Sequence, residues 1–393
     1  MTQNNFLSLV LALVFYQVGF CFGEEFIKTN GTHFTLNGEK LYLNGFNAYW
    51  MMYTATDQTT RPNVESAFHQ ASINGMNVAR TWAFSDGGYR PLQSAPGIYN
   101  EDTFKGLDFV ISEASKYGVH LILSLVNNWD DFGGKKQYVE WGKESGRSIS
   151  NVDEFFTDQV VRQYYKNHIE TILMRKNSIN GITYKDDPTI MAWELMNEPR
   201  CPSDLSGKTF QDWIIEMSNY VKSIDKNHLL EVGLEGFYNK TMQSKQFSNP
   251  SLLVGTDFIS NNQVPAIDFA TIHLYPNIWS PAIDEYVFVE QWIRNHIQDS
   301  NSIIEKPILL TEFGKSSRMS GFNVSVRDEY FGKVYDMLYD SAKNGESCAG
   351  GLFWQLLVSG LDNFRDGNEV ILDQDNSTAM LILSQSNRIY ALN

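Results

Sequence analysis

Eight short apolar segments recur along this chain, and most of them are separated by stretches with helical periodicity. Several segments lack polar alternation, as expected of strands that are buried on both faces. Strands of this kind, alternating with helices, form parallel sheets, and eight of them can close into a (β/α)8 TIM barrel. The predicted strands are residues 41–47, 78–83, 120–125, 190–195, 229–234, 269–274, 308–312 and 351–356.

The intervals between these segments predict helices, and no linker or low-complexity tract divides the chain. An open doubly wound sheet is the competing fold, but its marker, a Gly-x-Gly-x-x-Gly turn after the first strand, is missing. Asn37-Gly38 between two apolar runs predicts a short N-terminal β-hairpin. We therefore expect one α/β catalytic domain over residues 24–393. Its main helices are predicted at 64–74, 103–117, 153–175, 208–224, 282–298 and 326–344.

The first 23 residues have the pattern of a secretory signal peptide. An apolar run from Phe6 to Phe20 precedes Cys21 and Gly23, small residues at the −3 and −1 positions of a cleavage site after Gly23. A membrane anchor is the alternative, but the run is shorter than the roughly 20 residues of a span. We expect a secreted protein of the extracellular space or cell wall. Four glycosylation sequons then become candidates, at Asn30, Asn239, Asn323 and Asn376.

Charge and cysteine content narrow the partners and the covalent chemistry. The net charge of −15 argues against nucleic acid and anionic membrane as partners, and after signal cleavage we expect no membrane association and a monomer. Cleavage leaves Cys201 and Cys348, which the barrel places at opposite ends of their strands. Strand ends are well over about 10 Å apart, too far for a disulfide, so we expect two free thiols.

Polar and aromatic side chains gather where the predicted strands end. Active sites of (β/α)8 barrels lie at the carboxyl ends of the strands, so this placement predicts a functional site. A lone Asn-Glu-Pro often only caps a helix, and a lone histidine is usually structural, so the joint placement carries the argument. The residues concerned are Arg80, Trp82, Asn127, Asn128, Trp129, Asn197, Glu198, His273, Tyr275, Glu312 and Trp354.

Glu198 and Glu312, which end two apolar runs, suit the hydrolysis of a glycosidic bond. This reaction needs one carboxylic acid to protonate the leaving oxygen and one carboxylate to stabilise the anomeric carbon. Glu312 would be the nucleophile, kept ionised by Arg80 and by the hydroxyl of Tyr275. Glu198 would be the general acid/base. Glu194, inside its strand, is interpreted as structural.

Four further residues would bind and position the sugar. Asn197 could donate a hydrogen bond to the 2-hydroxyl, and His273 could orient Glu198 or bind a hydroxyl. Trp354 offers a flat ring as a floor at the point of cleavage, and Trp82 lies on the barrel wall.

Several motifs resemble glycoside hydrolase family 5: Trp-Glu-Leu-Met-Asn-Glu-Pro-Arg at 193–200, Thr-Glu-Phe-Gly at 311–314, Arg-Thr-Trp-Ala-Phe at 80–84 and Gly-Leu-Phe-Trp-Gln-Leu at 351–356. The segments 43–50, 85–93 and 126–129 are similar to plant-type endo-β-1,4-mannanases within that family. The resemblance runs from about residue 26 almost to the C-terminus. Leu274, Trp129 and Thr311 depart from residues common in the subgroup, and none of these departures removes a catalytic group.

The resemblance implies a retaining endo-hydrolase of mannan, glucomannan and galactomannan that uses no metal and no cofactor. It places the acid/base on Glu198, the nucleophile on Glu312 and the supporting arginine on Arg80. Its substrate contacts fall on Trp82, Asn197, His273, Tyr275 and Trp354.

Two other functions remain open from the residues alone. A β-1,4-glucanase would use the same barrel and carboxylates, because glucose and mannose differ only in the hydroxyl at C2. A non-catalytic carbohydrate-binding protein could also use the barrel, although it would have no need to keep both glutamates and Arg80.

Overall fold

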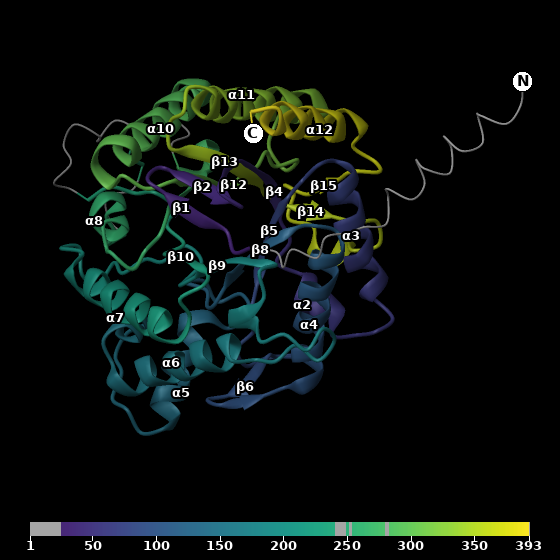
Figure 1. Ribbon diagram of the computed structural model, residues 1–393. Helices are drawn as coiled ribbons and strands as arrows, with labels where there is room; N and C mark the ends of the chain where they lie inside the picture. The colour runs from purple at the N-terminus through teal and green to yellow at the C-terminus, as the bar shows by residue number, and fades with distance from the viewer. Residues whose placement is uncertain (1–24, 240–248, 251–253, 280–282, 393) are drawn as a thin grey trace, which may run out of the picture.

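The computed structural model describes residues 25–239, 249–250, 254–279 and 283–392, so the proposed leader 1–23 lies outside the described residues. Eight parallel strands surrounded by helices form the main sheet, which confirms the predicted (β/α)8 fold (Figure 1). Their order around the barrel is β10-β9-β8-β5-β4-β13-β12-β11. The strands are β4 (Leu43–Asn47), β5 (Val78–Trp82), β8 (His120–Ser124), β9 (Ile190–Glu194), β10 (Leu229–Glu231), β11 (Ala270–Leu274), β12 (Ile308–Phe313) and β13 (Cys348–Phe353).

Strand β10 ends three residues earlier than predicted, because the chain turns at Gly233. This glycine has φ +93°, and a Cβ added there would lie 1.8 Å from the carbonyl oxygen of Met196. Only glycine tolerates both the left-handed backbone and this close approach. The segment 232–235 still closes the barrel between β10 and β11. The His273 amide donates to the carbonyl of Glu235 at 3.0 Å.

Polar capping residues set where the outer helices begin. Asn100, Asp158, Asp284 and Asn323 each accept hydrogen bonds from backbone amides of the first turn that follows. The Asp158 cap divides the predicted helix 153–175 into a short 3-10 helix and α6. The helices are α2 (Met51–Ala55), α3 (Arg61–Ile73), α4 (Glu101–Lys116), α5 (Gly134–Glu144), α6 (Gln159–Leu173), α7 (Lys208–Ile224), α8 (Phe258–Asn262), α9 (Pro276–Trp279), α10 (Glu285–Asp299), α11 (Val324–Lys343) and α12 (Asn376–Tyr390).

An antiparallel N-terminal sheet closes the amino end of the barrel. The predicted hairpin is present, with Asn37 and Gly38 in the left-handed turn, and one further strand joins it. Phe34 is fully buried and packs edge-on against Phe269 at 5.1 Å between ring centroids. The same apolar cluster takes in one or more residues of seven barrel strands, together with Phe269, which directly precedes β11. The sheet consists of β1 (Lys28–Asn30), β2 (His33–Leu36) and β3 (Glu39–Leu41).

Helix α12 was not predicted, and it braces the first barrel strand. The Asn44 amide on β4 donates to the Ser386 hydroxyl at 2.8 Å and to the carbonyl of Ile382 at 3.2 Å. The remaining strands form two small ribbons on the loops, β6 (Gln93–Ala95) with β7 (Ile98–Tyr99) and β14 (Leu356–Leu357) with β15 (Val370–Ile371).

The solvent exposure of the four sequon asparagines bears on the predicted glycosylation. Among the sequon asparagines, Asn30, Asn323 and Asn376 are exposed, whereas Asn239 is half-buried.

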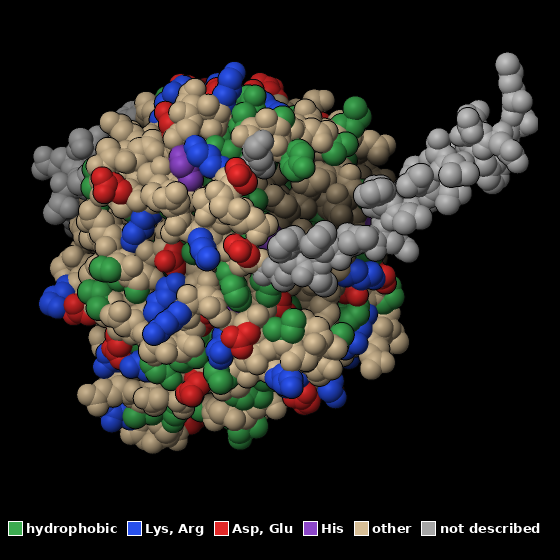
Figure 2. All heavy atoms as spheres, in the orientation of Figure 1, with side chains coloured by type: hydrophobic (Ala, Val, Ile, Leu, Met, Phe, Trp, Pro, Cys, Tyr) green, Lys and Arg blue, Asp and Glu red, His purple; other side chains and the backbone are tan. Residues whose placement is uncertain are grey.

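Cys201 and Cys348 are free and buried, which confirms the expectation of two thiols. Acidic and basic side chains lie interspersed on the face drawn in Figure 2. Within the described ranges, no helix combines the length and apolar character of a bilayer span.

Candidate active site

A cleft crosses the carboxyl ends of the barrel strands, and Glu198 and Glu312 lie in its middle. It consists of two adjoining hollows of about 490 Å³ and about 530 Å³, which share Trp129, Glu198 and Glu312 as walls. The cleft therefore extends to both sides of the carboxylate pair. Other walls of the first hollow include Tyr49, Trp82, Asn197, Trp354, Phe364 and Asp366, and those of the second include Arg200, Glu235, Phe237, Tyr275 and Trp279.

Glu312, on β12, is held by donors on both of its carboxylate oxygens. Arg80 donates to Oε1 at 2.6 Å, and the hydroxyl of Tyr275 donates to Oε2 at 2.8 Å. The pKa of Glu312 is raised, because the effect of burial outweighs the lowering effects of His273 and Arg80. The carboxylate is thus almost enclosed, with only 4% of the residue exposed, and its oxygens have fixed directions.

Arg80, on β5, connects the nucleophile candidate to the barrel interior. Its Nε and Nη2 donate to the two oxygens of Glu194 at 2.6 and 2.8 Å, and Nη2 also donates to Asn197 at 2.6 Å. Although burial lowers the pKa of Arg80, the charges of Glu194 and Glu312 raise it further, so the guanidinium stays charged. Glu194 is fully buried and its bidentate ion pair fixes the plane of the guanidinium. Glu194 was interpreted as structural, and its structural role is to orient Arg80.

Glu198 lies just beyond β9, on a left-handed backbone with φ +49°. Its amide donates to the carbonyl of Gly233 at 3.0 Å, which holds this unfavourable conformation in place. The indole of Trp129 donates to Oε2 at 2.7 Å, and His273 Nδ1 lies 2.6 Å from Oε1. Burial alone would raise the pKa of Glu198, but the bonds and charge from His273, with Trp129, lower it.

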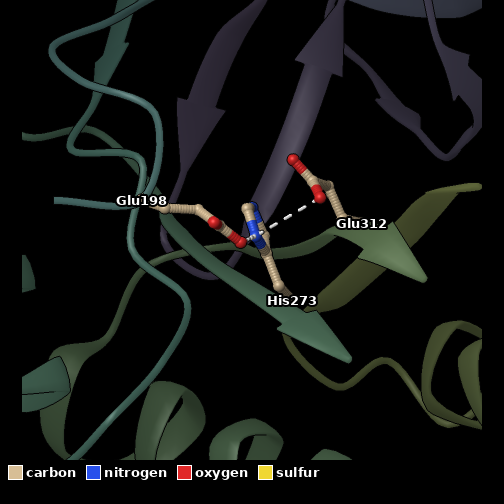
Figure 3. A group of neighbouring side chains, drawn as sticks. All are labelled: Glu198, His273 and Glu312. Carbon is tan, nitrogen blue, oxygen red and sulfur yellow. Dashed lines mark hydrogen bonds and ion pairs between the residues drawn. The ribbon is translucent and has the colours of Figure 1, made fainter. Parts of the chain in front are cut away.

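The His273 ring lies between the two carboxylates, as Figure 3 shows. Its Nδ1 is 2.6 Å from Glu198 Oε1 and 3.6 Å from Glu312 Oε2. Burial lowers the pKa of His273, but Glu312 and Glu198 together raise it above its ordinary value. The charge on each of the three groups therefore affects the pKa of the other two.

The separation of the two carboxylates fits a retaining glycosidase. One oxygen of each glutamate and one ring nitrogen of His273 all lie within 4.8 Å of one another. Retaining enzymes hold their carboxyl groups about 5–5.5 Å apart, whereas inverting enzymes need about 6.5–9.5 Å to admit a water. The proximity of these oxygens thus favours direct attack by a carboxylate.

The same three residues have donor types that could ligate a cation. The surrounding groups favour proton chemistry instead. Arg80 and Tyr275 point hydrogen-bond donors at Glu312, and the 2.6 Å bond to Glu198 occupies His273 Nδ1. A cation at this place would face a guanidinium and would have to displace these bonds.

Aromatic rings form the floor of the first hollow. Trp354 is half-buried and stacks on Tyr49, with centroids 5.5 Å apart and planes 7° from parallel. Its indole donates to Asp366 at 2.5 Å. Trp82 adjoins Trp354 at 6.3 Å, and Arg80 lies 5.1 Å above the Trp82 ring. These contacts fix a flat apolar surface beside the carboxylates.

The structure brings all eight residues that were assigned a catalytic, supporting or binding role to this cleft or directly beneath it. The sequence analysis assigned no role to four other residues that line the cleft, namely Trp129, Arg200, Glu235 and Asp366. Trp129 had a signal, because it follows the third strand, and Arg200 follows the Asn-Glu-Pro run. Glu235 and Asp366 had none, because loops of irregular shape bring them to the cleft. Arg200 donates to both oxygens of Glu235 at 2.5 and 2.8 Å, yet burial, with the charge of Glu198, raises the pKa of Glu235 to about 8.

Comparison with known proteins agrees with this geometry. The family model for glycoside hydrolase family 5 β-mannosidase-like proteins matches residues 24–362. Mannan endo-1,4-beta-mannosidase 4 of Solanum lycopersicum is 57% identical over 372 residues, which cover 94% of this chain and 92% of the relative. Mannan endo-1,4-beta-mannosidase 7 of Arabidopsis thaliana is 52% identical, with 98% of this chain and 90% of the relative covered.

A comparison with solved structures also finds similarity to a mannanase. The endo-1,4-beta-mannanase of Rhizomucor miehei superposes with a TM-score of 0.81 at 31% identity, covering 93% of this chain and all of that one. The family model alone spans most of the chain, and the cleft carries the carboxylate pair expected of a glycosidase. The chain therefore belongs to the β-mannosidase-like group of glycoside hydrolase family 5.

Proposed function

We propose that this chain is a retaining endo-β-1,4-mannanase that cleaves internal bonds of mannan, glucomannan and galactomannan. The observation that carries the proposal is the carboxylate pair, within 4.8 Å, at the centre of a cleft that continues to both sides. A chain-end enzyme needs a closed pocket on one side, whereas a polymer can cross this cleft. The names of the plant relatives and of the similar solved structures support mannan as the polymer.

In the first half of the reaction, Glu312 attacks the anomeric carbon while Glu198 protonates the leaving glycosidic oxygen. The C1–O bond breaks, and an ester forms between the sugar and Glu312. Arg80 and Tyr275 fix the direction of the attacking oxygens. Trp354 would carry the reacting mannose, with Trp82 and Asn197 beside it, and Asn197 would meet its 2-hydroxyl.

His273 links the proton supply to the state of the nucleophile. As the ester forms, the charge of Glu312 disappears, and with it one of the two anions that hold a proton on His273. The proton can then move along the 2.6 Å contact from Nδ1 to Glu198 and on to the leaving oxygen. In the second half, Glu198 takes a proton from water, the water oxygen attacks C1, and the Glu312 ester breaks with net retention.

The sequence supports a location outside the cell. Residues 1–23 would be removed as a signal peptide, leaving a single catalytic domain over residues 24–393 that acts as a monomer outside the cell, in the cell wall. Secretion would make the exposed sequons Asn30, Asn323 and Asn376 available for glycosylation, with Asn239 as a fourth candidate. N-terminal sequencing of secreted protein tests the cleavage: a mature chain that still carries Met1 would contradict it.

Activity on two polymers decides between mannanase and glucanase. Reducing ends released from galactomannan and from carboxymethyl cellulose should be compared at equal enzyme concentration, with the Glu312→Ala variant as the control. We expect release from galactomannan together with a rapid fall in its viscosity, which indicates internal cleavage. Faster release from cellulose would overturn the mannan assignment, and binding without any release would favour a non-catalytic protein.

A further inference from the structure

Glu231 is a buried acid that the catalytic steps proposed above do not use. It is the last residue of β10 and is fully buried. In the parallel pairing of β10 with β9, it lies directly opposite Glu194. Side chains alternate along a strand, so Glu231 points to the same side as Leu229, which belongs to the apolar cluster inside the barrel. Two glutamates therefore meet side by side in the barrel interior.

The carboxyl group of Glu231 holds the turn on which Glu198 depends. Its Oε2 accepts from the amide of Gly233 and, at 3.3 Å, from the hydroxyl of Thr271 on β11. The carbonyl of Gly233 in turn accepts from the amide of Glu198 at 3.0 Å and so supports its left-handed backbone. Glu231 therefore fixes one end of the glycine whose other end holds Glu198.

The contact between Glu231 and Glu194 requires a proton. The two carboxyl groups are hydrogen-bonded to each other, and two ionised carboxylates could not make this bond because neither has a hydrogen to donate. Glu194 accepts from Arg80 on both oxygens and from the hydroxyl of Ser124, which stabilises its charge. Glu231 Oε1 accepts from no donor in the described part of the chain. The hydrogen is therefore on Glu231, which donates to Glu194.

The electrostatics of the barrel interior support this position of the proton. Burial, together with the charge of Glu194, raises the pKa of Glu231 well above its usual range. Although burial also acts to raise the pKa of Glu194, the charge of Arg80 brings it below its ordinary value. Like charges that share a buried site move their pKa values apart in this way. An ionised Glu231 would compete with Glu312 for the charge of Arg80.

We propose that Glu231 is a positioning residue of the glycosidase reaction and acts as a neutral acid. Its O–H group donates to Glu194, which orients Arg80 behind the nucleophile, and its other oxygen accepts from the turn that holds Glu198. One side chain thereby connects the support of the nucleophile with the support of the acid/base. The inference rests on the proposed function, because it takes the roles of the two catalytic glutamates from it.

Glu231→Met tests the positioning role, because it removes both hydrogen bonds and keeps most of the side-chain volume. On mannohexaose, kcat should fall at least tenfold while KM stays within about twofold. On an aryl mannobioside, whose leaving phenolate needs no proton, the fall in kcat/KM should be at least threefold smaller, because the displaced group is the acid. A general loss of structure would lower the activity on both substrates equally.

Asp225→Ala is the matched control for the loss of a buried carboxyl group. Asp225 lies just before β10, at the amino end of the barrel, where it accepts from Trp193 Nε1 at 2.7 Å. This variant should lower the free energy of unfolding in urea and leave kcat per folded molecule near the wild-type value. A kcat loss in Asp225→Ala as large as that in Glu231→Met would overturn the positioning role.

Glu231→Gln tests the neutral acid, because its amide can donate to Glu194 and its carbonyl oxygen can accept from Gly233. It should rescue kcat to within about threefold of wild type, with the pH profile of kcat/KM unmoved. The infrared difference spectrum between wild type and this variant should contain the carbonyl stretch of a protonated carboxylic acid near neutral pH. Absence of that band, or a shift of the profile by more than about half a pH unit, would overturn the neutral acid.

Glu231→Asp guards against misfolding of the methionine variant. It keeps a carboxyl group but is one carbon shorter, so it cannot reach Glu194 and Gly233 together, and kcat should fall at least threefold. Wild-type kcat in folded Glu231→Met or, where that variant does not fold, in Glu231→Asp would overturn the positioning role and leave the mannanase assignment intact. Failure of wild type to cleave mannohexaose would instead overturn the proposed function.

Discussion

The two ends of the barrel contain opposite kinds of interior. At the amino end, the N-terminal sheet inserts Phe34 into a cluster composed of apolar side chains. At the carboxyl end, Arg80, Glu194 and Glu312 are buried together as an ion network beneath the open cleft. Apolar burial at the first end stabilises the fold. Buried ion pairs give little net stability, so the network at the second end is better explained by the positions it fixes.

The comparison predicts that substitutions at the carboxyl end reduce activity, whereas substitutions at the amino end reduce stability. In (β/α)8 barrels, residues at the carboxyl ends of the strands serve catalysis, while the opposite face serves stability. The four experiments below test that division.

The largest effect is expected for Glu312→Ala. Loss of the nucleophile should reduce kcat on mannan by about 10⁵-fold, while Arg80 keeps its bidentate partner Glu194 and the protein stays folded. Azide should restore part of the activity by entering the freed space and should give a product of the opposite anomer. The check is proton NMR of the azide product together with circular dichroism. Full activity in this variant would reject Glu312 as the nucleophile.

Glu198→Ala should have the next largest effect, and its size should depend on the leaving group. Loss of general acid catalysis costs about 10²–10⁴-fold on mannan, but far less on an aryl mannoside whose leaving phenolate needs no proton. The ratio of kcat/KM values on the two substrates measures the difference. Equal losses on both would argue against an acid role.

Phe34→Ala tests the opposite end. Removing a fully buried phenylalanine should lower the free energy of unfolding by about 3–5 kcal/mol, as measured by urea denaturation. The kcat per folded molecule should stay near the wild-type value, because the N-terminal sheet lies at the other end of the barrel. Phe26→Ala, which removes the ring of a half-buried phenylalanine just before β1, should cost less. A large loss of kcat in folded Phe34→Ala would refute the division between the ends.

The smallest effect concerns two histidines whose pKa values move in opposite directions. Glu312 and Glu198 raise the pKa of His273 against the effect of burial, so its contribution to stability is present below pH 6.5 and fades as the pH rises through the folded pKa. Burial and Lys40 lower the pKa of His33 at the amino end, so His33 costs stability as the pH falls below 6.5. The unfolding free energies of wild type, His273→Ala and His33→Ala should be compared at pH 5.5 and pH 8.5.

The stability difference between wild type and His273→Ala should be larger at pH 5.5 than at pH 8.5. The difference for His33→Ala should change in the reverse sense, and by less, because His33 is only half-buried. The same sign for both variants would contradict the assigned directions.

The sequence predicted the strands and the site residues that lie on them, because their signals are local. Glu312 ends an apolar run and Glu198 follows one, and barrel closure is enough to bring them together. The missed features depend on contacts between distant loops. The Arg200–Glu235 ion pair and the Trp354–Asp366 hydrogen bond each depend on backbone turns without a local pattern, whereas the early end of β10 follows from the turn at Gly233.

The boundary errors have similar physical causes. The predicted helix 153–175 is periodic throughout, but the Asp158 side chain bonds to the amides of Val160 and Val161 and starts a new helix there. Helix α12 is the helix that follows the last barrel strand, and it escaped prediction because the chain forms the small strands β14 and β15 between β13 and this helix. The helix packs against α11 with Ile382 fully buried, and the Asn44 amide on β4 bonds to its Ser386 hydroxyl.

The turn at Gly233 affects how the catalytic apparatus can tolerate change. The short segment 232–235 accepts the Glu198 amide through Gly233 and the His273 amide through Glu235. The backbones of Glu198 and His273 are thus both bonded to this segment. A small displacement of segment 232–235 would therefore move both residues together. Sequence drift in the outer helices can therefore shift this wall of the cleft while leaving the path of the proton between the two groups nearly unchanged.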